Sequence, residues 1–144
     1  MKTIRAIVFD GTTDNLTLTD VKDDLDGFYD AIKCSTFEGY SSTELGQSYG
    51  YDLYLDGNGK IGEVKPMLTG LFVRRETMQI VDTLVGNLLI CTHDDDGNSV
   101  SLGDVAPAIV ARHVRKRSET NIPDIWRDRF GEFKASPYLL VLYC

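Results

Sequence analysis

The chain has 144 residues, of which 42% are hydrophobic and 26% are charged, the composition of a single globular domain. No apolar run approaches the roughly 18 residues of a membrane span, so we expect a protein that does not enter the membrane. The net charge is −7 and is unevenly distributed. Residues up to Asp104 hold 8 basic and 18 acidic side chains, whereas residues from Val105 onward hold 7 basic and 4 acidic ones. The acidic excess argues against non-specific binding of nucleic acid.

The first half of the chain predicts short strands and one helix. Residues 4–9, "IRAIVF", predict a strand, and residues 15–20 predict a short strand or the entry to a helix. Asp20 is the expected cap of a helix to about Lys33, because apolar residues recur there at helical spacing. Further strands are expected near residues 34–40 and over residues 49–55.

The second half predicts a central strand, two helices and a final strand. Residues 79–93 predict the central strand, with a turn or bulge at Gly86-Asn87. A helix over residues 102–117 would be capped by Asp104, and a shorter one would begin at Pro123. The last stretch, "PYLLVLYC", has no charge and must be buried in its own sheet or against a second copy.

These elements predict the α+β class. We expect one domain, residues 1–144, with a mostly antiparallel sheet of hairpins packed with two to three helices. Residues 118–144 form a C-terminal helix and strand extension that is available for oligomer assembly. The odd number of cysteines, without paired spacing, predicts reduced thiols in a cytoplasmic protein, and the N-terminus does not resemble a signal peptide.

Two stretches that contain Asp-Gly-Asn have the residue types of calcium loops. Counted from Asp94, however, the EF-hand positions for glycine and glutamate hold Ser99 and Val105, and the loop that starts at Asp56 fails in the same way. We therefore interpret both stretches as hairpin turns whose glycines take positive φ.

Cys91 and His93 would share one face of a strand, beside three aspartates. No second pair of ligands has the spacing of a zinc site, and His113 is the only other histidine. A nucleophilic pair of cysteine and histidine, built on Cys34 or Cys91, lacks a third group that would orient it. We predict no catalytic residue, no metal and no cofactor, and a protein that is not an enzyme.

The strongest candidate for a binding site is basic. In the helix predicted over residues 102–117, Ala108, Ala111, Arg112 and Arg115 share one face. Small alanines beside guanidinium groups would let an anionic ligand approach, and arginine suits bidentate binding of phosphate. The alternative is a solvated helix face whose cations favour the helix dipole.

Several segments together resemble a family of small phage proteins that includes the first type of Thoeris anti-defence protein. They are "LDGFYDAIKCSTFE", "YDLYLDGNGKIGEVKP", "VGNLLICTHDDDGNSVSL" and the helix that follows, within about residues 16–117. Proteins of that family act as sponges, which bind cyclic ADP-ribose isomers made by the host defence system and sequester them without cleavage.

The resemblance implies a small α+β homo-oligomer, with the ligand held near subunit interfaces. The family's ligand contacts are an aromatic residue in the "GN-x-x-I" strand, the asparagine of "GN-x-x-SL" and an arginine in the next helix. By position these are Leu88 or Leu89, Asn98, and Arg112 or Arg115. The aromatic residue is absent here, which implies stacking on another ring or a different ligand, such as a cyclic oligonucleotide.

Three hypotheses follow for the function. The leading one is a phage sponge for a cyclic ADP-ribose-type or other cyclic nucleotide signal, such as those of the Thoeris and CBASS systems, that works in the host cytoplasm. In it, Arg112 and Arg115 bind phosphates and Asn98 reads a base or ribose. The second is an inhibitor whose acidic body binds a host defence protein, and the third is a nucleotide phosphodiesterase that would have to use His93, His113 and scattered carboxylates.

Overall fold

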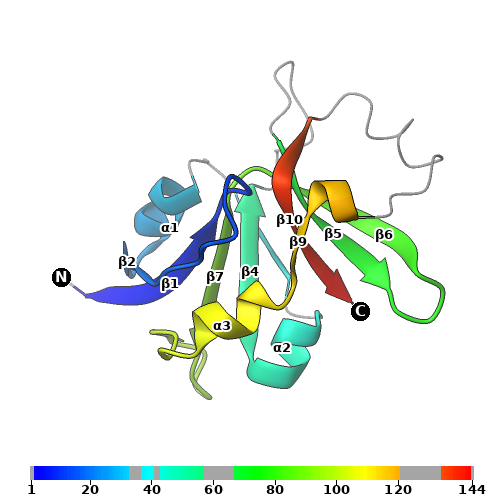
Figure 1. Cartoon of the computed structure of the whole chain (residues 1–144). Helices are drawn as coiled ribbons and strands as arrows, with labels where there is room; N and C mark the ends of the chain where they lie inside the picture. Colours follow the sequence, from blue (N-terminus) through cyan, green and yellow to red (C-terminus); the bar gives the residue numbers. More distant parts are fainter. Residues whose placement is uncertain (1, 33–36, 41–42, 57–66, 121–133, 144) are drawn as a thin grey trace.

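The computed structural model describes residues 2–32, 37–40, 43–56, 67–120 and 134–143. Within these ranges the chain folds into one α+β domain of two β-sheets and three short α-helices (Figure 1). The elements in chain order are β1 (Thr3–Phe9), β2 (Thr19–Lys22), α1 (Leu25–Ile32), β3 (Phe37–Tyr40), α2 (Glu44–Tyr49), β4 (Tyr51–Asp56), β5 (Leu68–Arg74), β6 (Gln79–Val85), β7 (Leu88–His93), β8 (Ser99–Val100), α3 (Ala106–Ala111), β9 (Val114–Lys116), a 3₁₀ turn (Arg117–Glu119) and β10 (Ala135–Tyr143).

The first sheet has the order β2-β1-β7-β4-β3, with β8 paired to β7, and every pairing in it is antiparallel. The central strand is β7, whose first four residues, Leu88 to Cys91, are buried on both faces of the sheet. The apolar run in the sequence therefore lies at the centre of a sheet, as expected.

The second sheet has the order β6-β5-β10-β9. Strand β10 runs parallel to β5 and antiparallel to β9, so that Leu140 lies opposite Gly70 on one side and Val114 on the other. The uncharged last strand is thus buried within its own chain. This removes the sequence-based reason for assigning it to oligomer assembly.

The main core lies between the two sheets and beneath α2 and α3. The buried residues of this cluster include Ile7, Phe9, Leu45, Leu53, Leu55, Phe72, Leu84, Leu88, Ile90, Leu102, Ala106, Val110, Leu140 and Leu142. On the opposite face of the first sheet, α1 packs over Ile4, Ala6 and Leu89 through Ile32 and Phe28 (Figure 1). Each of the three α-helices thus buries residues against a sheet.

The chain crosses from the second sheet to the first at Gly86. This glycine has φ +73°, its N–H donates to Met67, and its carbonyl accepts from the hydroxyl of Thr69 at 2.8 Å. The expected turn at Gly86-Asn87 is confirmed. The single strand predicted over residues 79–93 is wrong, because this turn divides it into β6 and β7 of different sheets.

The helix expected from Asp20 to Lys33 is shorter than predicted. Residues 19–22 form β2 instead, and Val21 is buried by pairing opposite Ile4 of β1. The helix starts after Asp24, whose carboxylate accepts a hydrogen bond from the N–H of Gly27 at 2.6 Å. Helix α2 was not predicted, and it includes Tyr49, which we had placed in a strand.

The helix predicted over residues 102–117 ends at Ala111. Val105, rather than Asp104, precedes its first turn, and Asp104 instead pairs with Arg5 at 3.7 Å. Residues 114–116 form β9, which pairs with β10. The shared helical face of Ala108, Ala111, Arg112 and Arg115 therefore does not form, because strand pairing overrides the helical pattern after Ala111.

The turn over residues 94–98 is a hairpin turn, as predicted. The N–H of Asp94 donates to the carbonyl of Asn98, and Gly97 has φ +83°. The glycines of the other turn and the helix expected from Pro123 lie outside the described residues. Among the residues that the structure describes, none of the helices combines the length and the apolar sequence needed to span a membrane.

Candidate functional site

Arg115 lies on the edge strand β9 of the second sheet, beside a pocket of about 450 Å³. The residues that line this pocket are Leu71, Val73, Met78, Ile80, Arg115, Glu119, Thr120, Val141 and Tyr143. Four of the apolar ones belong to a buried cluster on this face of the sheet, so the floor is apolar. The volume falls within the range of small-molecule sites, about 300–1,000 Å³.

The guanidinium group of Arg115 is tied to its own turn. Its Nη1 donates to the carbonyl of Val114 at 3.0 Å and to the carbonyl of Arg112. These bonds hold the cation at the rim of the pocket while its remaining N–H groups lie on an exposed side chain. The rim therefore offers one fixed cation, an aromatic ring from Tyr143 and the carboxylate of Glu119.

A cluster of charged residues lies beside this pocket and centres on Glu44. The Oε2 atom of Glu44 is 2.5 Å from Nη2 of Arg75, and its Oε1 atom is 2.9 Å from Nδ1 of His113. The guanidinium of Arg75 also lies over the ring of Tyr143, 5.0 Å from its centroid. This cluster thus joins residues from four parts of the chain, namely α2, the β5–β6 turn, the α3–β9 connection and β10.

Four charged side chains act on His113. Burial lowers the pKa of His113, the guanidinium groups of Arg115, Arg112 and Arg75 lower it further, and only the carboxylate of Glu44 opposes them. Three guanidinium groups and one carboxylate therefore act on a histidine whose pKa lies below its usual value. Such an excess of guanidinium groups favours an anionic ligand.

The two arginines singled out in the sequence are thus brought together, although not on one helix. Arg112 follows the last residue of α3, Arg115 lies on β9, and both act on His113 between them. Of the two, Arg115 lines the pocket. Sequence reasoning missed Glu44, Arg75 and Tyr143, because they come from distant segments and carry no local motif.

Asn98 lies at a different place in the molecule. It closes the β7–β8 hairpin of the first sheet, where its N–H donates to the carboxylate of Asp94 at 2.9 Å. The side chain is exposed, whereas Arg115 belongs to the second sheet. Within one chain, the structure does not place Asn98 beside the Arg115 pocket.

Leu88 and Leu89 are both fully buried in β7. Leu88 packs in the main core and Leu89 packs beneath α1, and each is 0% exposed. Strand β7 is central, so its two faces are both covered. Neither leucine offers surface for a ligand, and the position of the family's aromatic contact is a core position in this fold.

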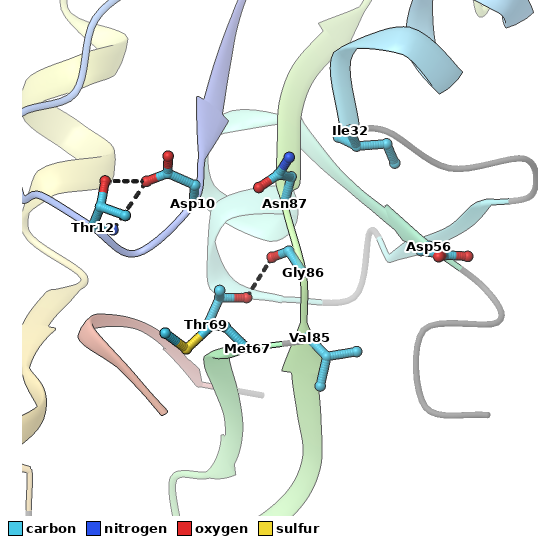
Figure 2. Close-up of a pocket in the computed structure, with 9 residues that line it drawn as sticks. All are labelled: Asp10, Thr12, Ile32, Asp56, Met67, Thr69, Val85, Gly86 and Asn87. Carbon is cyan, nitrogen blue, oxygen red and sulfur yellow. Dashed lines mark hydrogen bonds between the residues drawn. The ribbon is translucent and has the colours of Figure 1, made fainter. Parts of the chain in front are cut away.

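A second pocket, of about 410 Å³, lies where the two sheets meet at the ends of β1 and β4 (Figure 2). Its polar lining comes from Asp10, Thr12, Asp56, Thr69 and Asn87. Both the N–H and the hydroxyl of Thr12 donate to Asp10, and Figure 2 shows Asn87 between the two aspartates. The described lining holds two carboxylates and no cation, which disfavours a phosphate-bearing ligand here.

Cys91 and His93 do not form a reactive pair. The Nδ1 atom of His93 lies 2.6 Å from Oδ2 of Asp52, and this hydrogen bond raises the pKa of His93. Cys91 is 1% exposed, and burial, assisted by Asp52, raises its thiol pKa to about 12. In the described part of the chain, no three His, Cys, Asp or Glu side chains are grouped to hold a metal ion.

Cys91 should therefore resist thiol reagents in the folded protein. With a pKa of about 12, only roughly one thiol in ten thousand is ionised at pH 8, and the side chain is enclosed. In a Cys34→Ser/Cys144→Ser variant, we expect no colour with a disulfide reagent at pH 8 until urea unfolds the chain. Rapid labelling of the native protein would contradict this assignment.

Comparison with known proteins identifies the family. Residues 4–113 match the model of a family described as "Domain of unknown function (DUF3846)". No curated protein and no solved structure matches the chain. The matched segment covers well over half of the 144 residues and ends at His113, next to the candidate pocket, and on this match the chain belongs to the DUF3846 family.

Proposed function

We propose that the protein is a sponge that binds a cyclic ADP-ribose-type or other cyclic nucleotide immune signal and sequesters it without cleavage. The observation that carries this proposal is the position of Arg115, which lies at the rim of a 450 Å³ pocket with an apolar floor. The resemblance to phage anti-defence proteins adds to it. In this proposal the protein acts in the cytoplasm of the infected host cell.

The chemistry of the pocket suits a molecule with an anionic group and an aromatic base. A phosphate would bind the N–H groups of Arg115, and Arg112 and Arg75 would add to the attraction. A base would lie over the apolar floor against Tyr143, which would replace the aromatic residue that the resembling strand lacks. In a homo-oligomer, Asn98 of a neighbouring copy would reach the same ligand.

Sequestration predicts that the ligand is recovered intact. Purified protein incubated with cyclic ADP-ribose or cyclic di-AMP should retain the compound through gel filtration and release it unchanged after heat denaturation. Mass spectrometry of the released fraction, beside the native mass of the protein, is the measurement. Retention of neither compound would refute a sponge for these signals, and a linear product would point to the phosphodiesterase instead.

A second candidate is favoured by the β7–β8 hairpin. Asp95 and Asp96 are exposed at its tip, and the backbone N–H groups of Asn98 and Asp96 lower the pKa of the neighbouring Asp94. This tip would suit an inhibitor that binds a basic surface of a host defence protein. Co-purification of such a partner at low salt, lost at high salt, would favour this function over the sponge.

A further inference from the structure

We infer that Glu44 is a positioning residue of the Arg115 pocket, whose two carboxylate oxygens hold two walls of that pocket in place. The first wall is the Arg75–Tyr143 pair, and the second is the segment from His113 to Arg115. The inference rests on the proposed function, since it assigns Glu44 a role in the same ligand site.

The backbone that carries Glu44 is rigid. The residues on either side, Thr43 and Leu45, are each 2% exposed. Thr43 caps α2, because its hydroxyl accepts from the N–H of Gly46 at 3.3 Å and its carbonyl accepts from Gln47. Leu45 is anchored in the main core. The backbone therefore holds the Glu44 side chain in a fixed position.

The first wall depends on the Oε2 atom. This atom holds Nη2 of Arg75 at 2.5 Å, although the Arg75 side chain is otherwise largely exposed. The guanidinium so held lies over the Tyr143 ring at 5.0 Å. Tyr143 lines the pocket and Arg75 does not, so Arg75 supports the ring from outside the pocket.

The second wall depends on the Oε1 atom. This atom is enclosed by protein, has no hydrogen bond of regular geometry among the described residues, and lies 2.9 Å from Nδ1 of His113. The carbonyl of His113 accepts from the N–H of Val141, which lines the pocket floor. Arg115 follows two residues later, opposite Leu139 of β10. A shift of His113 would therefore displace both the cation and the floor.

Enclosing a carboxylate oxygen in this way disfavours folding, since the oxygen loses its water. A glutamine or an apolar residue would avoid that loss at a helix start whose cap is already supplied by Thr43. A carboxylate offers an acceptor oxygen to each of the two partners, whereas a glutamine amide has one acceptor oxygen and one donor group. That requirement accounts for the presence of glutamate.

Glu44→Gln is the direct test, with Glu76→Gln as its matched control. Glu76 is exposed, follows Arg75 and does not line the pocket, so its replacement makes the same change in charge nearby. For cyclic ADP-ribose, titration calorimetry should give a Kd about tenfold higher for Glu44→Gln, on the order of one lost charge-assisted hydrogen bond. Glu76→Gln should bind like the original protein, and both variants should keep its melting temperature within a few degrees.

A second readout is independent of any ligand. The chain has two histidines, so the ring signals of His113 can be assigned in NMR spectra by comparison with His93→Gln. The charged groups that act on His113 are Glu44, Arg75, Arg112 and Arg115, and Glu44 alone raises its pKa. Glu44→Gln should therefore lower the pKa of His113 further, and Glu76→Gln should not change it.

The outcomes separate the two proposals. If the original protein and Glu76→Gln both bind cyclic ADP-ribose and Glu44→Gln binds equally well, the positioning role is refuted and the sponge stands. If no protein binds either test compound, the sponge is refuted for these signals, and an unchanged His113 pKa in Glu44→Gln refutes the positioning role by itself. Glu44→Asp, which keeps the charge but is too short for both partners, should bind with intermediate affinity.

Discussion

Replacement of Leu88 by alanine should lower the free energy of unfolding by about 3 kcal/mol, as removal of a fully buried leucine side chain leaves a cavity. Leu88 is 0% exposed and packs in the main core on the central strand of the first sheet. Equilibrium unfolding in urea, followed by circular dichroism, is the measurement. The midpoint should fall while the slope stays the same.

Asn98→Ala is the comparison for this experiment. Its side chain is exposed at the hairpin tip, so its hydrogen bond to Asp94 is open to solvent, and the backbone N–H keeps its own bond to that carboxylate. Stability should therefore change little. Leu88→Ala and Asn98→Ala therefore compare a core position with a surface position, both of which the resemblance implies to be ligand contacts. A Leu88→Ala protein of unchanged stability but weakened ligand binding would show that Leu88 is a contact residue after all.

Arg115→Gln should weaken the binding of cyclic ADP-ribose by on the order of tenfold to a hundredfold, the range for loss of hydrogen bonds to a charged group. Arg115 is a cation that lines the 450 Å³ pocket, and glutamine is shorter and uncharged, so it cannot neutralise a phosphate. Titration calorimetry at low and moderate salt measures the change. The original protein should lose affinity with salt more steeply than the variant.

Arg74→Gln provides the matched control for this effect. Arg74 is exposed at the end of β5 and does not line the pocket, so its replacement alters the net charge equally. We expect its affinity to stay within about twofold of the original, as for an exposed charge outside the pocket. Equal losses in both variants would mean that general charge, rather than the pocket, attracts the ligand.

The strands were the part of the fold that the sequence predicted best. Alternation and apolar runs located β1, β4, β7 and β10, because burial of one or both faces leaves a pattern in the residues themselves. The class, α+β with mostly antiparallel sheets, is confirmed. What the pattern could not supply was the assignment of strands to two sheets, which depends on the reversal at Gly86.

The helices were predicted less well, for a related reason. Residues 19–22 and 114–116 belong to helical patterns of apolar residues, yet they pair with strands β1 and β10, respectively. The sequence does not predict helix α2, because this helix has six residues and buries only Leu45. Long-range pairing and short length both remove the local signal on which sequence reasoning relies.

The candidate site, too, could be predicted from the sequence only in part. Arg112 and Arg115 could be named from the sequence because charge is visible there. Glu44, Arg75 and Tyr143 could not, since their roles arise only when α2, the β5–β6 turn and β10 come together. Position within a resembling motif was a poor guide for Leu88 and Leu89, because the strand that carries them is central.

The place of β10 also dictates the order in which the molecule can fold. Leu68 of β5 pairs with Ala135, so the second sheet must wait until residues 135–143 have been synthesised. Until then the hairpin of β5 and β6 has an open edge and an uncovered apolar face, the state in which nascent chains meet chaperones or aggregate. The family-matched segment, residues 4–113, stops before β9 and β10, so it lacks two strands of the second sheet.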